Sequence, residues 1–196
     1  MGFLLMSYEY QRATREVSVH QAAKMRLNNQ AERCEKRVKR MESVFDKAKS
    51  RVETKYRELS SEASNNIQSA VLSNDLATFQ NLVNNIVIGS ICLGSMVEVP
   101  TSVPQGSNIT AVLSQCSSQA KTAIDMLINR AKEAETEAIE EQEENMLEPI
   151  REKGSDLEAD AALEDTLITT WQTRQEAAKS HLGEGIKNSM GSYGLA

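Results

Sequence analysis

Residues 3–88 of this chain contain neither glycine nor proline, the two residues that most often interrupt regular structure. Two further stretches, 107–148 and 155–182, also lack both. No segment alternates apolar and polar residues with the period of two that is typical of strands, and we expect no β-hairpin. The pattern therefore predicts an all-α protein built from very long helices with few breaks.

Apolar residues recur along the first long stretch in alternating steps of four and three, and a second row with the same steps begins near residue 109. This spacing is typical of a coiled-coil seam, in which one narrow stripe of each helix packs against a partner. Aromatic residues make up only 4% of the chain, so we expect thin seams rather than a thick core. The expected seam residues are Leu27, Ala31, Cys34, Val38, Met41, Phe45, Val52, Leu113, Cys116, Ala120 and Leu127.

These features predict an elongated antiparallel helical hairpin, or coiled-coil bundle, with an apolar helical insertion between its long helices. Residues 60–75 are the weakest part of the first helix, and Ser73-Asn74-Asp75 has the composition of an N-cap before Leu76. A first helix that continues through this segment and one that breaks within it both remain open. The expected parts are a long N-terminal helix at 1–63, an apolar insertion and loop at 64–107, C-terminal helices at 108–182 with a kink near 149–154, and a flexible tail at 183–196.

Charge is divided unevenly along the chain. Residues 1–75 carry 14 Lys and Arg against 10 Asp and Glu, whereas residues 76–196 carry 8 against 18. If Leu27 and Cys34 occupy position a of the heptad, a row of cations falls at position g, which flanks the seam and selects partners. We expect this row to face acidic residues on another helix. The charged partner face consists of Arg26, Arg33, Arg40, Lys47, Glu133, Glu137, Glu140 and Glu144.

The two charged rows also bear on how the hairpin is folded. A plain hairpin folded near Val103 places residue 33 opposite residue 173, far from the glutamates. A separate insertion at 64–107 instead places residue 33 opposite residue 138, inside the acidic row. Complementary charges select register more than they add stability, so they favour the second arrangement or an equivalent contact between subunits.

The stretch Leu82–Val99 is apolar and rich in small residues, with Ser90 and Gly94 spaced as in closely packed helices. Its uninterrupted apolar part is too short for a transmembrane helix, which needs about 20 residues. We expect a buried helix or a subunit contact, with a membrane-inserting hairpin as the alternative. The apolar patch consists of Ile86, Val87, Ile88, Ile91, Leu93 and Val97.

The sequence contains few residues or motifs that indicate a catalytic or cofactor-binding site. The three cysteines are widely spaced, and His20 and His181 are the only histidines. His20 is in phase with the seam, where we expect it to pair with a polar neighbour. No phosphate-binding loop, dinucleotide fingerprint or HExxH motif is present. We expect no enzyme activity and no catalytic, metal or cofactor site, and the net charge of -6 does not favour nucleic acid as a partner.

The leading functional hypothesis is a non-enzymatic structural protein that self-assembles by helix packing. The layout of paired terminal helices around a different inserted segment is similar to that of type III secretion filament proteins and flagellins. That resemblance of layout implies a secreted or surface filament subunit exported without a cleaved signal. The alternatives are a membrane-surface remodelling or pore-forming protein and a cytosolic coiled-coil adaptor or chaperone.

Expected partners are further copies of the chain, with a helical protein or a membrane as alternatives. We find no cleavable signal and no full transmembrane helix in the sequence. Either the cytoplasm or secretion by a route independent of the Sec pathway is therefore expected.

Overall fold

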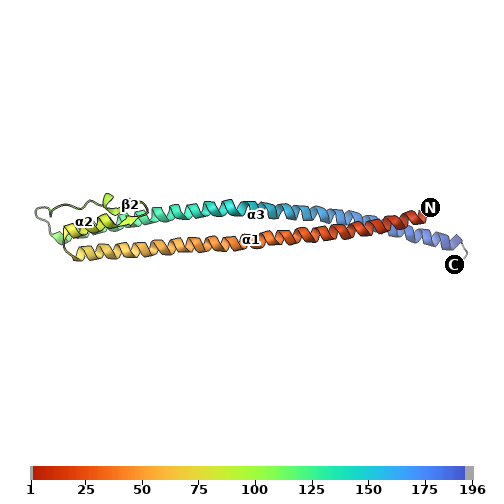
Figure 1. Ribbon diagram of the computed structural model, residues 1–196, viewed down its shortest axis with the longest axis horizontal. Helices are drawn as coiled ribbons and strands as arrows, with labels where there is room; N and C mark the ends of the chain where they lie inside the picture. Colours follow the sequence, from red (N-terminus) through yellow and green to blue (C-terminus); the bar gives the residue numbers. More distant parts are fainter. Residues whose placement is uncertain (1, 193–196) are drawn as a thin grey trace. The chain divides into compact units, whose positions relative to one another are not determined.

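The structure, a computed structural model, describes residues 2–192 (Figure 1). The predicted all-α class is confirmed, because two long helices account for most of the described residues. In chain order, the elements are α1 (Gly2–Leu72), α2 (Leu76–Asn85), β1 (Val87–Ile88), β2 (Ile91–Cys92), the 3-10 helix η1 (Leu93–Ser95) and α3 (Ile109–Ser192).

The chain divides into two compact units. Unit 1 consists of α1 up to Met41 together with α3 from Met146 onward, and unit 2 consists of Glu42–Asn145. In each unit, a segment of α1 and a segment of α3 lie side by side and run in opposite directions. The predicted antiparallel pairing of the long helices is therefore confirmed.

The first helix continues through the weak segment and ends at Leu72, beyond the expected boundary at residue 63. The chain then turns at Asn74, whose φ of 52° lies in the left-handed region. Asp75 caps α2, because its carboxylate accepts hydrogen bonds from the backbone N–H and the hydroxyl of Thr78 at 2.8 and 2.6 Å. The N-cap that we expected before Leu76 is confirmed.

Both expected registers of the hairpin are wrong. In unit 1, residue 34 lies beside residue 154, since a Cβ added to Gly154 would sit 3.6 Å from the Cβ of Cys34. In unit 2, the hydroxyl of Thr110 lies 3.4 Å from the side-chain oxygen of Asn74. The longer α1 explains the failure of the second register, because the helix that we ended at residue 63 extends to Leu72. The plain hairpin failed because residues 73–108 lie between the two paired helices.

The expectation of a helical insertion is wrong beyond Asn85. Instead, β1 and β2 form a short antiparallel hairpin in which Val87 pairs with Cys92 and Ile88 with Ile91. Its two-residue turn begins at Gly89, whose φ of 64° suits glycine at the first central position of a tight hairpin turn. The sequence signal was present, because a Gly-Ser pair between β-branched residues is a recognised hairpin pattern.

The C-terminal part of the chain is more continuous than expected. A single helix, α3, continues through Pro149 and Gly154 and extends to Ser192, so residues 183–192 are helical where we expected the flexible tail to begin. Residues 193–196 of that expected tail lie outside the described residues. Gly154 faces α1, and a Cβ added there would make an ordinary van der Waals contact with the Cβ of Cys34 at 3.6 Å.

Unit 2 has a core of large apolar side chains from three layers. The amphipathic helix α2 and the hairpin that follows it pack over the end of α1 and the start of α3 (Figure 1). Phe79 of α2, Leu93 of η1 and Leu113 of α3 are fully buried. Other members of this core are Val52, Tyr56, Ala63, Ile67, Ala70, Val83, Ile88, Val97, Cys116, Ala120, Ala123, Ile124, Leu127 and Ile128.

Unit 1 is built from two helices alone, and its buried positions hold smaller side chains. The alanines among them allow close approach of α1 and α3 but bury little apolar area, and buried area sets the size of the hydrophobic stabilisation. The buried residues of unit 1 are Ala13, Val17, Ala31, Leu147, Ala161, Ile168 and Ala178.

Candidate functional site

Every expected seam residue faces inward in its own unit. Those that are buried are Ala31, Val52, Leu113, Cys116, Ala120 and Leu127. Those that are only half-buried are Leu27, Cys34, Val38, Met41 and Phe45. The half-buried group shows that a seam of two helices leaves part of its apolar surface accessible to water.

The cations that we expected to flank the seam lie on the outer face of α1. Arg26, Arg33, Arg40 and Lys47 are all exposed on α1. Their placement at position g was wrong. The step from Leu27 to the buried Ala31 is four residues, which puts Leu27 at position d and these cations at position c, away from the partner helix.

Other lysines contact α3. In unit 2, Lys49 lies 2.9 Å from Glu143 and 3.3 Å from Glu140, so Glu140 of the expected acidic row pairs with a lysine that is not in the expected basic row. Glu133, Glu137 and Glu144 are exposed. The hydrogen bond with Glu143 raises the pKa of Lys49.

A second group of polar contacts in unit 2 surrounds Glu135. The ammonium of Lys55 donates to this carboxylate at 2.8 and 3.1 Å and also lies over the ring of Tyr56, 5.0 Å from its centre. The hydrogen bonds from Lys55 and then Tyr56 lower the pKa of Glu135. Burial and the hydrogen bond with Glu135 raise the pKa of Tyr56. These contacts hold α1 and α3 in register.

Unit 1 has its own polar contacts between the two helices. His20 lies 2.6 Å from Glu164, which confirms the polar neighbour that we expected for a histidine in seam phase. Lys24 lies 2.6 Å from Asp165. The sequence reasoning identified the position of His20 but not its partner, because the partner depends on the hairpin register.

Most residues of the expected apolar patch are buried in the core of unit 2 or pack against it. Ile88, Leu93 and Val97 are buried in the core. Ile86 and Ile91 are half-buried and pack against it, whereas Val87 is exposed. The interior position of most of these side chains removes them from the surface that a membrane-inserting hairpin would need.

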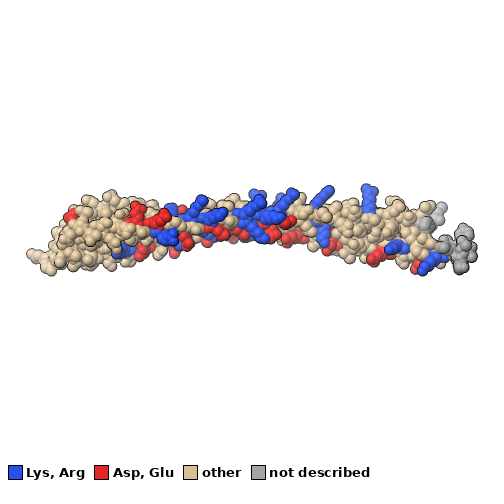
Figure 2. Space-filling view, turned by 90° about the horizontal axis from the view of Figure 1, so that it is seen from below, with Lys and Arg blue, Asp and Glu red and all other residues tan. Residues whose placement is uncertain are grey.

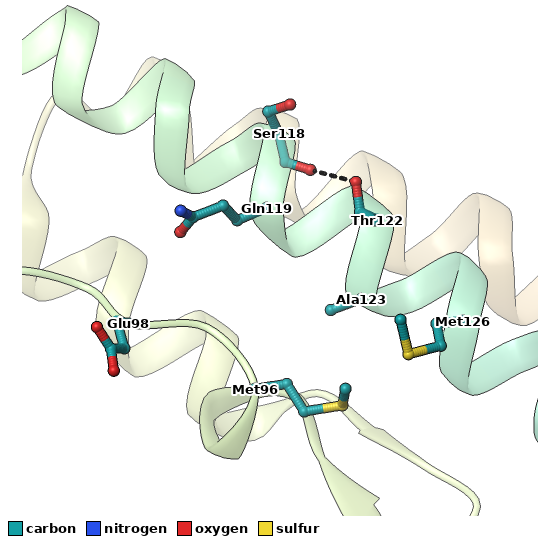
Figure 3. Close-up of a pocket in the computed structure, with 7 residues that line it drawn as sticks. All are labelled: Met96, Glu98, Ser118, Gln119, Thr122, Ala123 and Met126. Carbon is teal, nitrogen blue, oxygen red and sulfur yellow. Dashed lines mark hydrogen bonds between the residues drawn. The ribbon is translucent and has the colours of Figure 1, made fainter.

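A groove lies on the surface of unit 2, between the segment that follows η1 and the helix α3 (Figure 3). Its volume is about 500 Å³. Met96 and Met126 lie toward one end of it, and Glu98 and Gln119 lie toward the other. The hydroxyl of Thr122 in this groove donates to the backbone carbonyl of Ser118 at 3.1 Å. The lining offers a mixed apolar and polar surface without a cluster of charged groups.

The outer face of α1 in unit 1 carries several exposed apolar side chains. Its apolar side chains are 52–79% exposed and occupy helix positions that point away from the seam. We call this row the apolar outer row, and its members are Leu4, Leu5, Tyr8, Val19 and Met25. The sequence reasoning missed it because only inward-facing periodicity was followed. The correct heptad phase identifies these positions as b, c or f.

Three further findings are negative. Among residues 2–192, no three His, Cys, Asp or Glu side chains are grouped so as to hold a metal ion. In the part of the chain that the structure describes, no helix is both long enough and apolar enough to cross a membrane. Comparison with protein-family models, curated proteins and solved structures found no match.

Proposed function

We propose that this protein is a non-enzymatic structural subunit that self-assembles through the outer faces of its long helices. The observation that carries the proposal is the apolar outer row on α1. Scattered apolar residues are normal on protein surfaces, but several on one face of one helix are typical of an interaction site. A second copy that covered this face would remove the row from water.

The thin packing of unit 1 supports the same proposal. Two helices joined by a narrow seam bury one stripe of each helix, and most of the stability of a helix in a protein comes from such burial. The buried alanines of unit 1, Ala13, Ala31, Ala161 and Ala178, add little apolar area. A further layer of helices from other copies would supply the burial that unit 2 obtains from α2 and the hairpin.

A filament is the specific form of assembly that we propose, in line with the layout of the paired terminal helices. The membrane-remodelling alternative is less well supported, because Ile88, Leu93 and Val97 lie in the core of unit 2. The adaptor alternative differs in its assembly, since an adaptor would form one small complex at every concentration.

The test is sedimentation velocity and negative-stain electron microscopy of the full chain over a concentration series. We expect growth into large assemblies as the concentration rises. The variant Val19→Asp places a charge in the apolar outer row and is expected to raise the concentration at which assembly begins. Leu72→Asp is the matched control, because Leu72 is also exposed but belongs to unit 2.

Three results would contradict the proposal. One is a single small species at every concentration of the unchanged protein. Another is assembly that is equally sensitive to both substitutions, which would indicate unspecific apolar aggregation. Assembly that Val19→Asp leaves unchanged would show that the apolar outer row takes no part in it.

A further inference from the structure

The two helices of unit 1 carry opposite charge. The α1 part has nine Lys and Arg against four Asp and Glu, and the described α3 part has five against nine. In the middle of the face shown in Figure 2, most Lys and Arg side chains project along one edge, whereas Asp and Glu gather toward the opposite edge. Charged residues of unit 1 that are exposed and point away from the seam include Arg26, Arg33 and Arg40 on α1, and Glu148, Glu152 and Asp156 on α3.

The cations and the acids lie at the same level along unit 1. Cys34, within the basic stretch, lies beside Gly154, within the acidic stretch. Because α1 and α3 are paired through their seams, these two charged surfaces point outward on opposite flanks. Each surface is therefore left for a neighbouring molecule rather than for the helix beside it.

Exposed apolar residues of α1 and α3 also lie at the same level along unit 1. Lys24 pairs with Asp165 across the two helices, so Met25 on α1 lies at about the level of Leu163 on α3. Both side chains are more than half exposed. From this level toward Met41, α1 presents the exposed Arg26, Arg33 and Arg40, and from this level back toward Met146, α3 presents the exposed Glu148, Glu152 and Asp156.

We propose that a second copy of this chain packs alongside unit 1 in the same direction and without a large axial shift, so that the outer face of its α3 covers the outer face of α1. This inference deepens the proposed function and rests on it. The arrangement brings cations against acids and apolar residues against apolar residues at once. A copy that runs in the opposite direction could align the charged surfaces only if the exposed apolar residues of the two molecules no longer faced each other. A copy that packs its α1 against α1 would bring cations together.

This pairing joins the outer face of α1 on one molecule to the outer face of α3 on the next. After each addition, one α1 face and one α3 face therefore stay free at the two ends of the assembly. Such heterologous contacts form a ring where the rotation closes and an open filament where it does not. A closed two-fold dimer is not expected from this interface.

The test uses two charge-reversed variants of the full chain. The α1-reversed variant carries Arg26→Glu, Arg33→Glu and Arg40→Glu, and the α3-reversed variant carries Glu148→Lys, Glu152→Lys and Asp156→Lys. Alone, each variant sets like charges against each other, and we expect the concentration at which assembly begins to rise about ten-fold or more. An equimolar mixture of the two is expected to assemble like the unchanged protein, because each reversed surface then meets its complement.

A variant with all six reversals is expected to assemble on its own, and this result separates lost complementarity from damage to the fold. Circular dichroism should give the same helical content for every variant, since the six positions are exposed. If the α1-reversed variant assembles as readily as the unchanged protein, the inference is wrong while the proposed function stands. If it assembles better when mixed with the unchanged protein than either does alone, α1 packs against α1 and the inference is wrong.

Two further outcomes concern the unchanged protein. If it never assembles, both the inference and the proposed function are wrong. If it stays monomeric but floats with phosphatidylserine vesicles, and the α1-reversed variant does not, the basic face binds a lipid surface rather than a second copy.

Discussion

Unit 1 and unit 2 contain segments of the same two helices, yet they reach stability in different ways. In unit 2, α2 and the hairpin add a third layer, so that Phe79, Leu93 and Leu113 are removed from water completely. In unit 1, two helices meet along one seam with alanine at more than half of the buried positions. The difference teaches that a heptad pattern specifies pairing but does not by itself provide a thick core.

The largest expected effect is in the core of unit 2. Phe79→Ala should lower the free energy of unfolding by about 3–5 kcal/mol, because it leaves a cavity among large side chains. Urea denaturation followed by circular dichroism measures the change. Leu72→Ala is the control at an exposed position of the same unit and should change the free energy by less than about 0.5 kcal/mol. Similar values for the two variants would refute the layered core.

The next effect tests the close approach of helices in unit 1. Ala161 is buried, whereas Ala162 beside it is exposed. Ala161→Leu should lower the free energy of unfolding by about 1–3 kcal/mol, because a larger side chain pushes α1 and α3 apart. Ala162→Leu is the matched control and should have almost no effect. If Ala161→Leu instead stabilised the protein, the seam would contain enough unfilled space for the larger side chain.

Replacing glycine by alanine should have opposite signs in the two units. A Cβ at Gly94 would lie 1.9 Å from the side-chain oxygen of Asn84 and 3.2 Å from its Cα, so Gly94→Ala should destabilise unit 2 by about 1 kcal/mol or more. Nothing lies within 4 Å of such a Cβ at Gly183 in α3. Gly183→Ala should therefore stabilise the helix by up to about 1 kcal/mol. Thermal melting of the two variants measures both effects. If both substitutions changed the melting temperature in the same direction, the packing at Gly94 would be contradicted.

The smallest effect concerns the contacts of Glu135. Its pKa is lowered from an ordinary value of 4.5, so the ion pair stabilises the fold above that value and its contribution is lost as the pH falls through the lowered pKa. The pKa of Lys55 is raised from 10.5, so its contribution is present below that value and is lost as the pH rises through the raised pKa. The melting temperature of Glu135→Gln should lie below that of the unchanged protein between these limits and converge with it in acid.

Glu137→Gln is the control for this pH series, because Glu137 is exposed on the same helix. Its melting curve should follow that of the unchanged protein across the range. A Glu135→Gln deficit that persists below the lowered pKa would show that the carboxylate acts through packing rather than through charge.

The sequence predicted those parts of the fold that depend on local pattern. Long stretches without Gly or Pro predicted the two long helices, and the heptad steps predicted their inward faces. The position of Asp75 before Leu76 predicted the N-cap of α2. The hairpin register was not predictable in the same way, because it depends on where α1 ends, and Ser60–Leu72 stays helical through tertiary packing despite weak propensity. The ion pairs of Lys49 and Lys55 followed that register.

The candidate surface could have been predicted in part. The step of four from Leu27 to Ala31 already placed Arg26, Arg33 and Arg40 on the outer face, and the same phase places Met25 beside them. The level of Glu148 and Asp156 relative to those cations could not be obtained without the register. The hairpin at Gly89 was missed because two-residue strands carry too few side chains for a periodic signal, although the Gly-Ser turn pattern itself was present.

The central claim is that unit 2 is complete within one chain whereas unit 1 is completed by a neighbouring copy. Hydrogen–deuterium exchange with mass spectrometry, measured over a concentration series of the full chain, tests it most directly. We predict that peptides covering 4–26 and 160–186 gain protection as the concentration rises, while peptides covering 76–93 and 113–128 keep the same protection throughout. Protection in unit 1 that does not depend on concentration would contradict the claim.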